Sequence, residues 1–188
     1  MSPAGVDFEE RYRSDPDPWG YESSGYEHAK YAATLSACGP GPFDSALELG
    51  ASIGVFSAQL APRAKSLVTI DGAPTAVAAA RRRLAPFPQA RVLLGTIPDE
   101  LPDGRFDLVV ASEVLYYLTV SAVERALARL REAMAPGGRL VAVHWRPTGP
   151  ERPLDARTVH DLLRAQAWLA PVNRADTGDY LLDVLEAR

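Results

Sequence analysis

The stretch Ser45-Ala46-Leu47-Glu48-Leu49-Gly50-Ala51-Ser52-Ile53-Gly54-Val55-Phe56 decides the fold of this chain. It opens as a short apolar run, which is typical of a buried parallel strand. The chain then turns at Gly50, and from Gly54 the apolar residues continue at helical spacing. A strand, a glycine turn and a helix start direct backbone N–H groups at a ligand above the strand. Glu48 lies at the exit of this strand, where a charge is costly unless it meets a ligand.

A second apolar run, 66–71, follows the predicted helix and ends in Asp71. Asp71 lies about 20 residues beyond the glycine turn, the spacing of a carboxylate that binds ribose hydroxyls. The dinucleotide pattern G-x-G-x-x-G is not satisfied, because Ser52 and Val55 hold its second and third glycine positions. What remains is E-x-G-x-x-x-G with a distal acid. This spacing predicts a nucleotide-type site and counts against a nicotinamide oxidoreductase.

Composition narrows the classes of partner. The chain has 188 residues and a formal net charge of −4, and it lacks a long basic run, so we expect no nucleic-acid partner. One cysteine, Cys38, permits neither an internal disulfide nor a cysteine-based metal site, and no metal is predicted. No apolar run approaches the roughly 20 residues of a membrane span, and no secretion signal precedes the first strand. A cytoplasmic setting without membrane contact is the default expectation; the sequence does not indicate an oligomeric state.

Strands and helices alternate from residue 44 onward. Helices are predicted at 26–35, 54–61, 74–85, 121–135 (with a Ser121/Glu124 capping box, ended by 136–138) and 155–167, and strands at 44–49, 66–71, 91–94, 106–111, 140–145, 168–174 and 179–186. This alternation predicts an α/β fold: a Rossmann-like, doubly wound, mostly parallel sheet of about seven strands with an antiparallel last strand. We expect a single domain, 1–188, with an N-terminal lid or helix segment (1–40) and a core (41–188).

Several stretches resemble one enzyme family. Residues 106–118 resemble the fourth-strand motif of class I S-adenosylmethionine-dependent methyltransferases, and 134–140 resembles their L-x-P-G-G-x-L turn before the fifth strand. The glycine loop is similar to their (D/E)-x-G-x-G-x-G loop, with Ser52 at the middle glycine. More narrowly, residues 15–20, 26–31 and 113–118 resemble the nodulation-protein-S (NodS) type. That family N-methylates the amino group of a glucosamine-containing oligosaccharide.

The resemblance implies S-adenosyl-L-methionine as cofactor, S-adenosyl-L-homocysteine as product and a small-molecule methyl acceptor. The glycine loop would wrap the methionine part beside Glu48, Asp71 would accept bonds from the ribose hydroxyls, and Thr96 and Ile97 would contact the adenine. Threonine stands at 96 where the family often has Asp. The cofactor residues implied in this way are Trp19, Tyr31, Glu48, Gly50, Ala51, Ser52, Gly54, Asp71, Gly72, Thr96, Ile97 and Ser112, with Trp19 and Tyr31 closing the pocket from the N-terminal side.

Two residues at the carboxyl ends of strands are candidate catalytic groups, because ligands bind there in open α/β sheets. His144 is a candidate proton acceptor, since histidine titrates in the right range, or a hydrogen-bonded structural residue. Glu113 is predicted to orient a substrate amine or hydroxyl, or to cap a helix or pair with an arginine. Candidate substrate residues are Tyr116, Tyr117, Trp145 and Arg146. His28 and His160 are predicted to be solvated helix residues.

These observations predict methylation of a small molecule, in the first place N-methylation of an amino sugar or sugar-containing metabolite. O-methylation of a natural-product scaffold uses the same cofactor site and stays open, because pocket shape decides between them. A non-catalytic methyltransferase-like binding module is the third alternative. Glu48, Gly50, Gly54 and Asp71 count against it, because a silent site has no reason to keep a buried acid.

Overall fold

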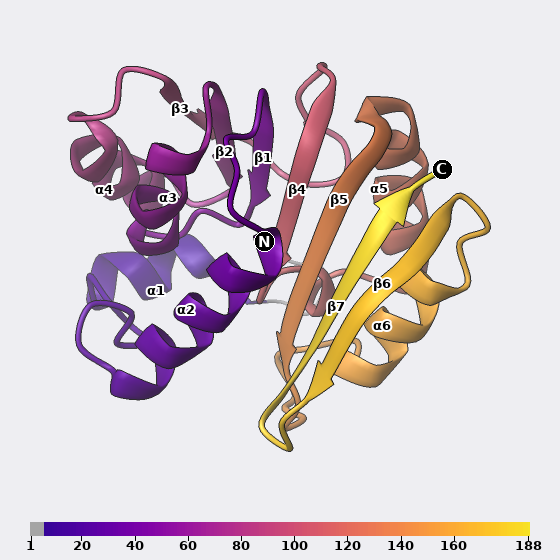
Figure 1. Cartoon of the computed structure of the whole chain (residues 1–188). Coiled ribbons are helices and arrows are strands. Elements are labelled where there is room, and N and C mark those ends of the chain that lie inside the picture. The colour runs from indigo at the N-terminus through magenta and orange to yellow at the C-terminus, as the bar shows by residue number, and fades with distance from the viewer. Residues whose placement is uncertain (1–5) are drawn as a thin grey trace.

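A seven-stranded sheet forms the centre of the structure, a computed structural model that describes residues 6–188 (Figure 1). The spatial order is β3-β2-β1-β4-β5-β7-β6. β1 to β5 run parallel, and β7 is antiparallel to both β5 and β6, as predicted. The strands are β1 (Ala46–Leu49), β2 (Leu67–Asp71), β3 (Ala90–Leu94), β4 (Phe106–Ser112), β5 (Met134–Trp145), β6 (Leu169–Asp176) and β7 (Tyr180–Ala187).

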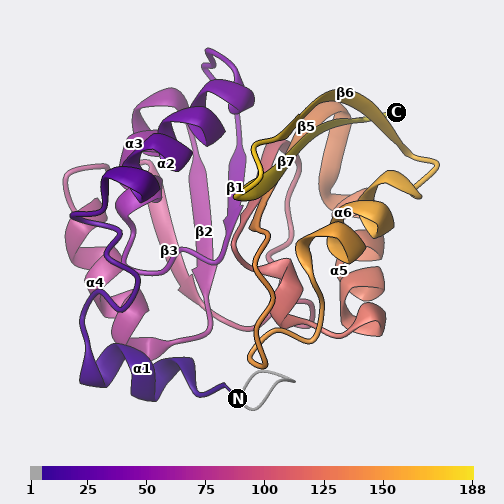
Figure 2. The same cartoon turned by 90° about the horizontal axis from the view of Figure 1, so that it is seen from below.

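Helices cover both faces of this sheet (Figure 2). α2, α3 and α4 lie on one face, α5 and α6 lie on the other, and α1 crosses near the carboxyl ends of the first strands. The helices are α1 (Phe8–Ser14), α2 (Gly25–Cys38), α3 (Val55–Leu60), α4 (Pro74–Leu84), α5 (Val120–Ala133) and α6 (Ala156–Arg164), with short 3-10 turns at Ala61–Arg63 and Leu115–Tyr117.

The central strands are apolar on both sides because each side faces helices. Leu47 and Leu49 of β1 pack with the residues of α5 and α6, while Ala46 packs with the residues of α3 and α4. β1 and β4 pair through Leu47 and Val109, both fully buried. The carboxyl ends of β1, β2 and β4 therefore meet at one edge, which is where the fold places its cavity.

Three predicted details differ from the structure. α5 begins after Thr119, whose side chain accepts a hydrogen bond from the Ala122 N–H at 3.2 Å, so the predicted Ser121/Glu124 capping box is wrong. The stretch 136–138 does not end that helix, because α5 stops at Ala133 and β5 begins at once. A Cβ at Gly138 would lie 2.7 Å from the Ala135 carbonyl oxygen, so this tight entry into the strand requires glycine. α1 was not predicted.

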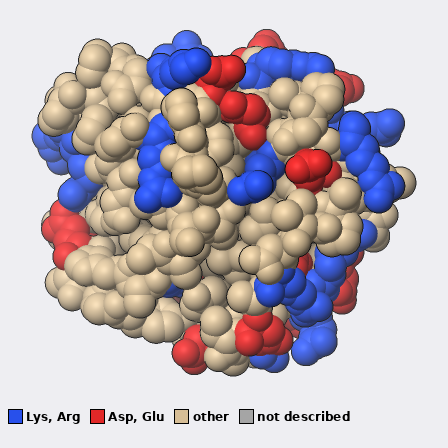
Figure 3. Space-filling model, in the orientation of Figure 1, with Lys and Arg blue, Asp and Glu red and all other residues tan. Residues whose placement is uncertain are grey.

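The surface carries charges of both signs, which are interspersed over the face drawn in Figure 3. β6 forms one open edge of the sheet; Pro171 and a break in register between Pro171 and Asn173 interrupt it, and Val172 beside them is exposed. Within residues 6–188, none of the helices combines the length and the apolar character that crossing a membrane requires.

Candidate functional site

A cavity of about 270 Å³ lies at the carboxyl ends of β1, β2 and β4, under α1. Most of the residues predicted for the cofactor line it, together with residues of α1 that were not predicted. The lining comprises Val6, Asp7, Phe8, Glu9, Tyr12, Trp19, Tyr21, Tyr31, Glu48, Gly50, Ala51, Ser52, Phe56, Ile70, Asp71, Gly72, Ala73, Gly95, Thr96, Ile97, Ser112, Glu113, Val114, Tyr117 and Leu118. Residues far apart in the sequence therefore share one hollow.

Two residues of the glycine loop, Gly50 and Ser52, have positive φ angles, and the second of them is not a glycine. Gly50 has φ +78°, and a Cβ there would lie 3.1 Å from the Val114 side chain, so both conformation and space favour glycine. Ser52 also has a positive φ, +50°, at the position where the resembling loops have their middle glycine. The Tyr12 hydroxyl donates to Ser52 Oγ at 2.6 Å, which ties α1 to the loop. Serine thus keeps the glycine backbone and gains a contact with α1.

Asp71 joins the ends of the first two strands. Its two carboxylate oxygens accept hydrogen bonds from the Ser52 N–H at 2.8 Å and the Ala73 N–H at 2.9 Å. Burial raises the pKa of Asp71, and these backbone donors oppose that shift. Because each carboxylate oxygen has further acceptor capacity, Asp71 can also accept hydrogen bonds from a hydroxyl pair in the cavity.

Glu48 is a carboxyl group with little solvent around it. It is 3% exposed, it lines the cavity, and one of its oxygens accepts a hydrogen bond from Ser57 Oγ at 2.5 Å. Burial raises the pKa of Glu48 to about 7, opposed by its hydrogen bond to Ser57. A cationic group in this part of the cavity would favour the ionised form.

Glu113 stands at the other side of the cavity in a strained backbone, with φ +56°. Lys30 Nζ donates to its Oε1 at 2.9 Å, and the Tyr116 hydroxyl and the Trp145 N–H donate to its Oε2. Lys30 is itself 3% exposed and pairs with Glu27 as well. Residues of three elements, α2, the 3-10 turn Leu115–Tyr117 and β5, therefore hold this carboxylate. Its cationic partner is Lys30 and not the arginine that the sequence analysis offered as an alternative.

Ser112 supplies a free polar atom. Ser112 lines the cavity, and its hydroxyl is buried and finds no hydrogen-bond partner among residues 6–188. A buried hydroxyl without a partner is unusual in folded proteins. A ligand carrying polar atoms would satisfy it, and an adenosyl amino acid offers such atoms. This orphaned hydroxyl and the carboxylates of Glu48 and Asp71 suit a ligand with a cationic end and a ribose.

Aromatic side chains close the cavity from the N-terminal side. The ring of Trp19 lies 5.4 Å from that of Tyr12 and 5.8 Å from that of Tyr21, and Tyr31 lies 5.4 Å from Phe56. Side chains between Val6 and Tyr31 therefore form one wall of the cavity. The lid segment predicted at 1–40 stays a prediction, and its residues 1–5 lie outside the described residues. The sequence analysis did not predict Tyr12 as a site residue. The three-residue spacing of Asp7 and Glu10 could have indicated the start of α1, because the Asp7 side chain caps this helix by accepting a hydrogen bond from the Glu10 N–H.

Four predicted ligand residues do not line the cavity. Gly54 has φ +80° and its Cβ would lie 3.0 Å from Ala80 Cα, so it serves the packing of α3 on α4. Tyr116 is buried behind Glu113, Trp145 is 38% exposed, and Arg146 pairs with Asp176 at 2.6 Å. Of the four residues predicted for the substrate, the structure brings only Tyr117 to the cavity wall.

His144 lies inside the protein and away from the cavity wall. Its Nε2 accepts a hydrogen bond from the Leu115 N–H at 3.2 Å, and its Nδ1 lies 3.1 Å from Nε2 of His160. His160 Nδ1 in turn lies 2.8 Å from an oxygen of Asp183. Burial holds the pKa of His144 well below its usual value. These contacts do not support His144 as the proton acceptor. They fit the second alternative, a hydrogen-bonded structural residue.

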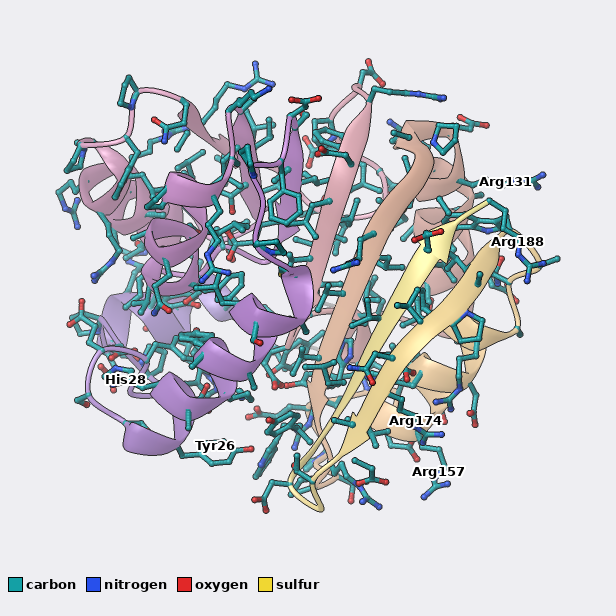
Figure 4. All side chains as sticks on the ribbon, in the orientation of Figure 1. Tyr26, His28, Arg131, Arg157, Arg174 and Arg188 are labelled. Atoms are coloured by element: carbon teal, nitrogen blue, oxygen red, sulfur yellow. The ribbon has the colours of Figure 1, made fainter. Side chains whose placement is uncertain are left out.

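The prediction of a solvated His160 is wrong, because this ring is fully buried in the same chain of hydrogen bonds. Acceptance from Leu115 leaves Nε2 of His144 without a proton, so the Nδ1–H of His144 donates to His160. His160 then donates to the carboxylate of Asp183, which Arg164 also contacts at 3.0 Å. His28 is exposed, as predicted (Figure 4).

The family model and the first three sequence relatives that match this chain all name the same protein family. The family described as Nodulation protein S (NodS) matches residues 4–147. Nodulation protein S of Sinorhizobium fredii (strain NBRC 101917 / NGR234) is 34% identical over 127 residues, which cover 66% of this chain and 59% of that protein. The chain spans between 53% and 64% of the length of the first three such relatives.

Solved structures agree with the sequence relatives. The N-methyltransferase NodS from Bradyrhizobium japonicum WM9, solved in complex with S-adenosyl-L-homocysteine, superposes with a TM-score of 0.85 at 28% identity and covers 95% of both chains. A demethylmenaquinone methyltransferase of Beutenbergia cavernae is 33% identical over 155 residues, or 81% of this chain and 60% of that protein. This chain belongs to the nodulation protein S family and has the class I methyltransferase fold.

Proposed function

We propose that this chain is an S-adenosylmethionine-dependent methyltransferase that N-methylates a small molecule bearing an amino sugar. One observation carries the proposal: Glu48, Asp71 and Glu113 line a single cavity beside the glycine loop. The related NodS protein, an N-methyltransferase whose structure holds S-adenosyl-L-homocysteine, supports the choice of cofactor and of nitrogen as acceptor.

The residues of β1 and β2 account for cofactor binding. The turn from Gly50 to Ser52 would lie along the methionine part, with the Glu48 carboxylate near its cationic end. Asp71 would accept hydrogen bonds from the ribose hydroxyls through the acceptor capacity left by its two backbone donors. Thr96 and Ile97 would lie against the adenine, and Thr96 Oγ1 is 3.0 Å from Glu100. When bound, the cofactor supplies a methyl group already activated on a sulfonium.

Glu113 is the residue that we expect to bind the amine of the methyl acceptor. An amine attacks only with an unshared electron pair, so its proton must first be accepted by another group. Glu113 directly follows β4 and lines the cavity, and Lys30, Tyr116 and the Trp145 backbone hold its carboxylate in one orientation. It would orient the amine and take its proton. Tyr12 and Trp19 would exclude water from above, because both line the cavity under α1.

The cofactor part is tested by thermal stability. S-adenosyl-L-homocysteine should raise the melting temperature and NAD should not, since only a ligand of the native state stabilises it. Stabilisation by NAD alone would contradict the assignment.

The acceptor part is tested by Glu113→Gln against Glu124→Gln, a matched change on an exposed position of α5. Release of S-adenosyl-L-homocysteine with a panel of amino sugars should fall about 100-fold in the first variant, the lower range for loss of a general base. Cofactor affinity should hold in both variants. A panel in which hydroxylated scaffolds react and amines do not would replace N-methylation by O-methylation.

A further inference from the structure

Arg152 differs from the other half-buried arginines of the described chain. Each of those places its guanidinium on a carboxylate or a backbone carbonyl: Arg11 on Glu151, Arg63 on Leu35, Arg83 on Ile53, Arg129 on Leu101, Arg139 on Cys38, Arg146 on Asp176 and Arg164 on Asp183. The guanidinium of Arg152 has no acceptor among residues 6–188. Its five N–H groups are therefore available for a ligand.

Two aromatic rings hold this guanidinium in place. Its Cζ lies 4.8 Å from the centre of the Trp145 ring and 5.0 Å from that of Tyr116. Contact with ring faces covers the plane of a guanidinium and leaves its N–H edges for planar, bidentate recognition of an oxyanion. An arginine held in this way loses little conformational freedom on binding, so its charge is prepared for a ligand.

The position of Arg152 connects it with the proposed acceptor site. Tyr116, which contacts Arg152, donates its hydroxyl to the Glu113 carboxylate, and the adjacent Tyr117 lines the cavity. The neighbouring acid accepts no hydrogen bond from Arg152, because both oxygens of Glu151 bind Arg11, although the charge of Arg152 helps to lower the pKa of Glu151. A small molecule with its amine at Glu113 would therefore present its far end to a guanidinium that lacks a hydrogen-bond acceptor.

We propose that Arg152 binds an oxyanionic group, a phosphate or carboxylate, on the methyl acceptor. The inference rests on the proposed function and narrows its substrate class to amines that also carry an anion. Trp145 and Tyr116 then act as positioning residues for the guanidinium. Trp145 and Tyr116 were predicted as substrate residues, and this reading gives them an indirect part in substrate binding.

The test measures binding by calorimetry in saturating S-adenosyl-L-homocysteine, with glucosamine, glucosamine 6-phosphate and glucosaminate as probes. The protein should bind a charged probe at least about tenfold more tightly than glucosamine, as expected of a charge-assisted bidentate contact. The phosphate and carboxylate probes distinguish the two anions. Arg152→Gln should remove the preference, and Arg152→Lys should keep part of it, because the charge remains and the fork is lost.

Arg157→Gln is the matched control, since Arg157 is an exposed arginine of α6 that projects from the outer side of the molecule (Figure 4). Melting curves establish that each variant is folded. Equal binding of charged and neutral probes, binding of none of them, or a preference that survives Arg152→Gln would overturn the proposal. Methyl transfer to the same probes is measured in separate samples that contain S-adenosyl-L-methionine in place of S-adenosyl-L-homocysteine: a charge preference without transfer would support the anion site and refute the proposed methylation.

Discussion

The substitution Glu48→Gln measures how much the ionisation of this buried carboxyl group lowers the free energy of unfolding. Burial raises the pKa of Glu48 in the folded chain from 4.5 to about 7. Below about pH 4.5 the group is protonated in both the folded and the unfolded chain. As the pH rises, the unfolded chain releases this proton first, so ionisation favours unfolding until the folded chain ionises near pH 7. The stability that protonation provides is thus present in acid and lost on the way to neutral pH.

The magnitude follows from the two pKa values. At about 1.36 kcal/mol per pKa unit, the interval between 4.5 and about 7 corresponds to about 3 kcal/mol of unfolding free energy. Most of that change, about 2–3 kcal/mol, develops between pH 5 and pH 8. Glutamine has nearly the shape of glutamic acid and does not titrate, so the variant escapes this loss while it keeps all other titratable groups of the parent.

The assay is urea unfolding of both proteins at several values between pH 5 and pH 8, without ligand. The free energy of unfolding of Glu48→Gln should rise relative to that of the parent by about 2–3 kcal/mol over this range. Glu124→Gln, on the exposed side of α5, should show a flat difference. Parallel pH profiles for the parent and Glu48→Gln would refute the reasoning, because they would mean that the group titrates alike in both states.

Two further outcomes test the site and the core. Asp71→Asn should weaken binding of S-adenosyl-L-homocysteine by about tenfold or more, because a charged acceptor of hydroxyl hydrogen bonds is lost; calorimetry measures it, and unchanged affinity would remove the ribose role. Leu127→Ala, at a side chain 1% exposed, should cost about 2–5 kcal/mol in urea unfolding, while Val120→Ala, at 42% exposure on the same helix, should cost under about 0.5 kcal/mol. Similar costs at the two positions would contradict the burial described for α5.

The sequence predicted the sheet well because its central strands are buried on both faces and end in recognisable turns. Asp71 and Gly50 were placed at one edge by the parallel order of β1 and β2, and the structure joins them through Ser52. Local patterns were enough there, since the strand ends, the glycine turn and the distal acid lie close together in the sequence.

The missed features depend on distant partners. α1 is a helix of seven residues, too short for a clear periodicity, and its burial comes from contacts such as Tyr12 with Ser52. His160 was predicted to face solvent because no metal-ligand partner is spaced with it in the sequence, whereas Asp183 on β7 supplies the partner that permits its burial. Arg152 carries no motif, and only the folded chain brings it to Tyr116 and Trp145.

The interrupted edge of β6 bears on how the protein behaves in concentrated solution. A sheet edge with a regular row of N–H and C=O groups is a template onto which another chain can add a strand. Pro171 contributes no N–H to such a row, and the register break beside it spoils the regular repeat that an incoming strand would have to match. The interrupted edge therefore disfavours the addition of further strands that would lead to fibrils, although the apolar side chain of Val172 is exposed beside it.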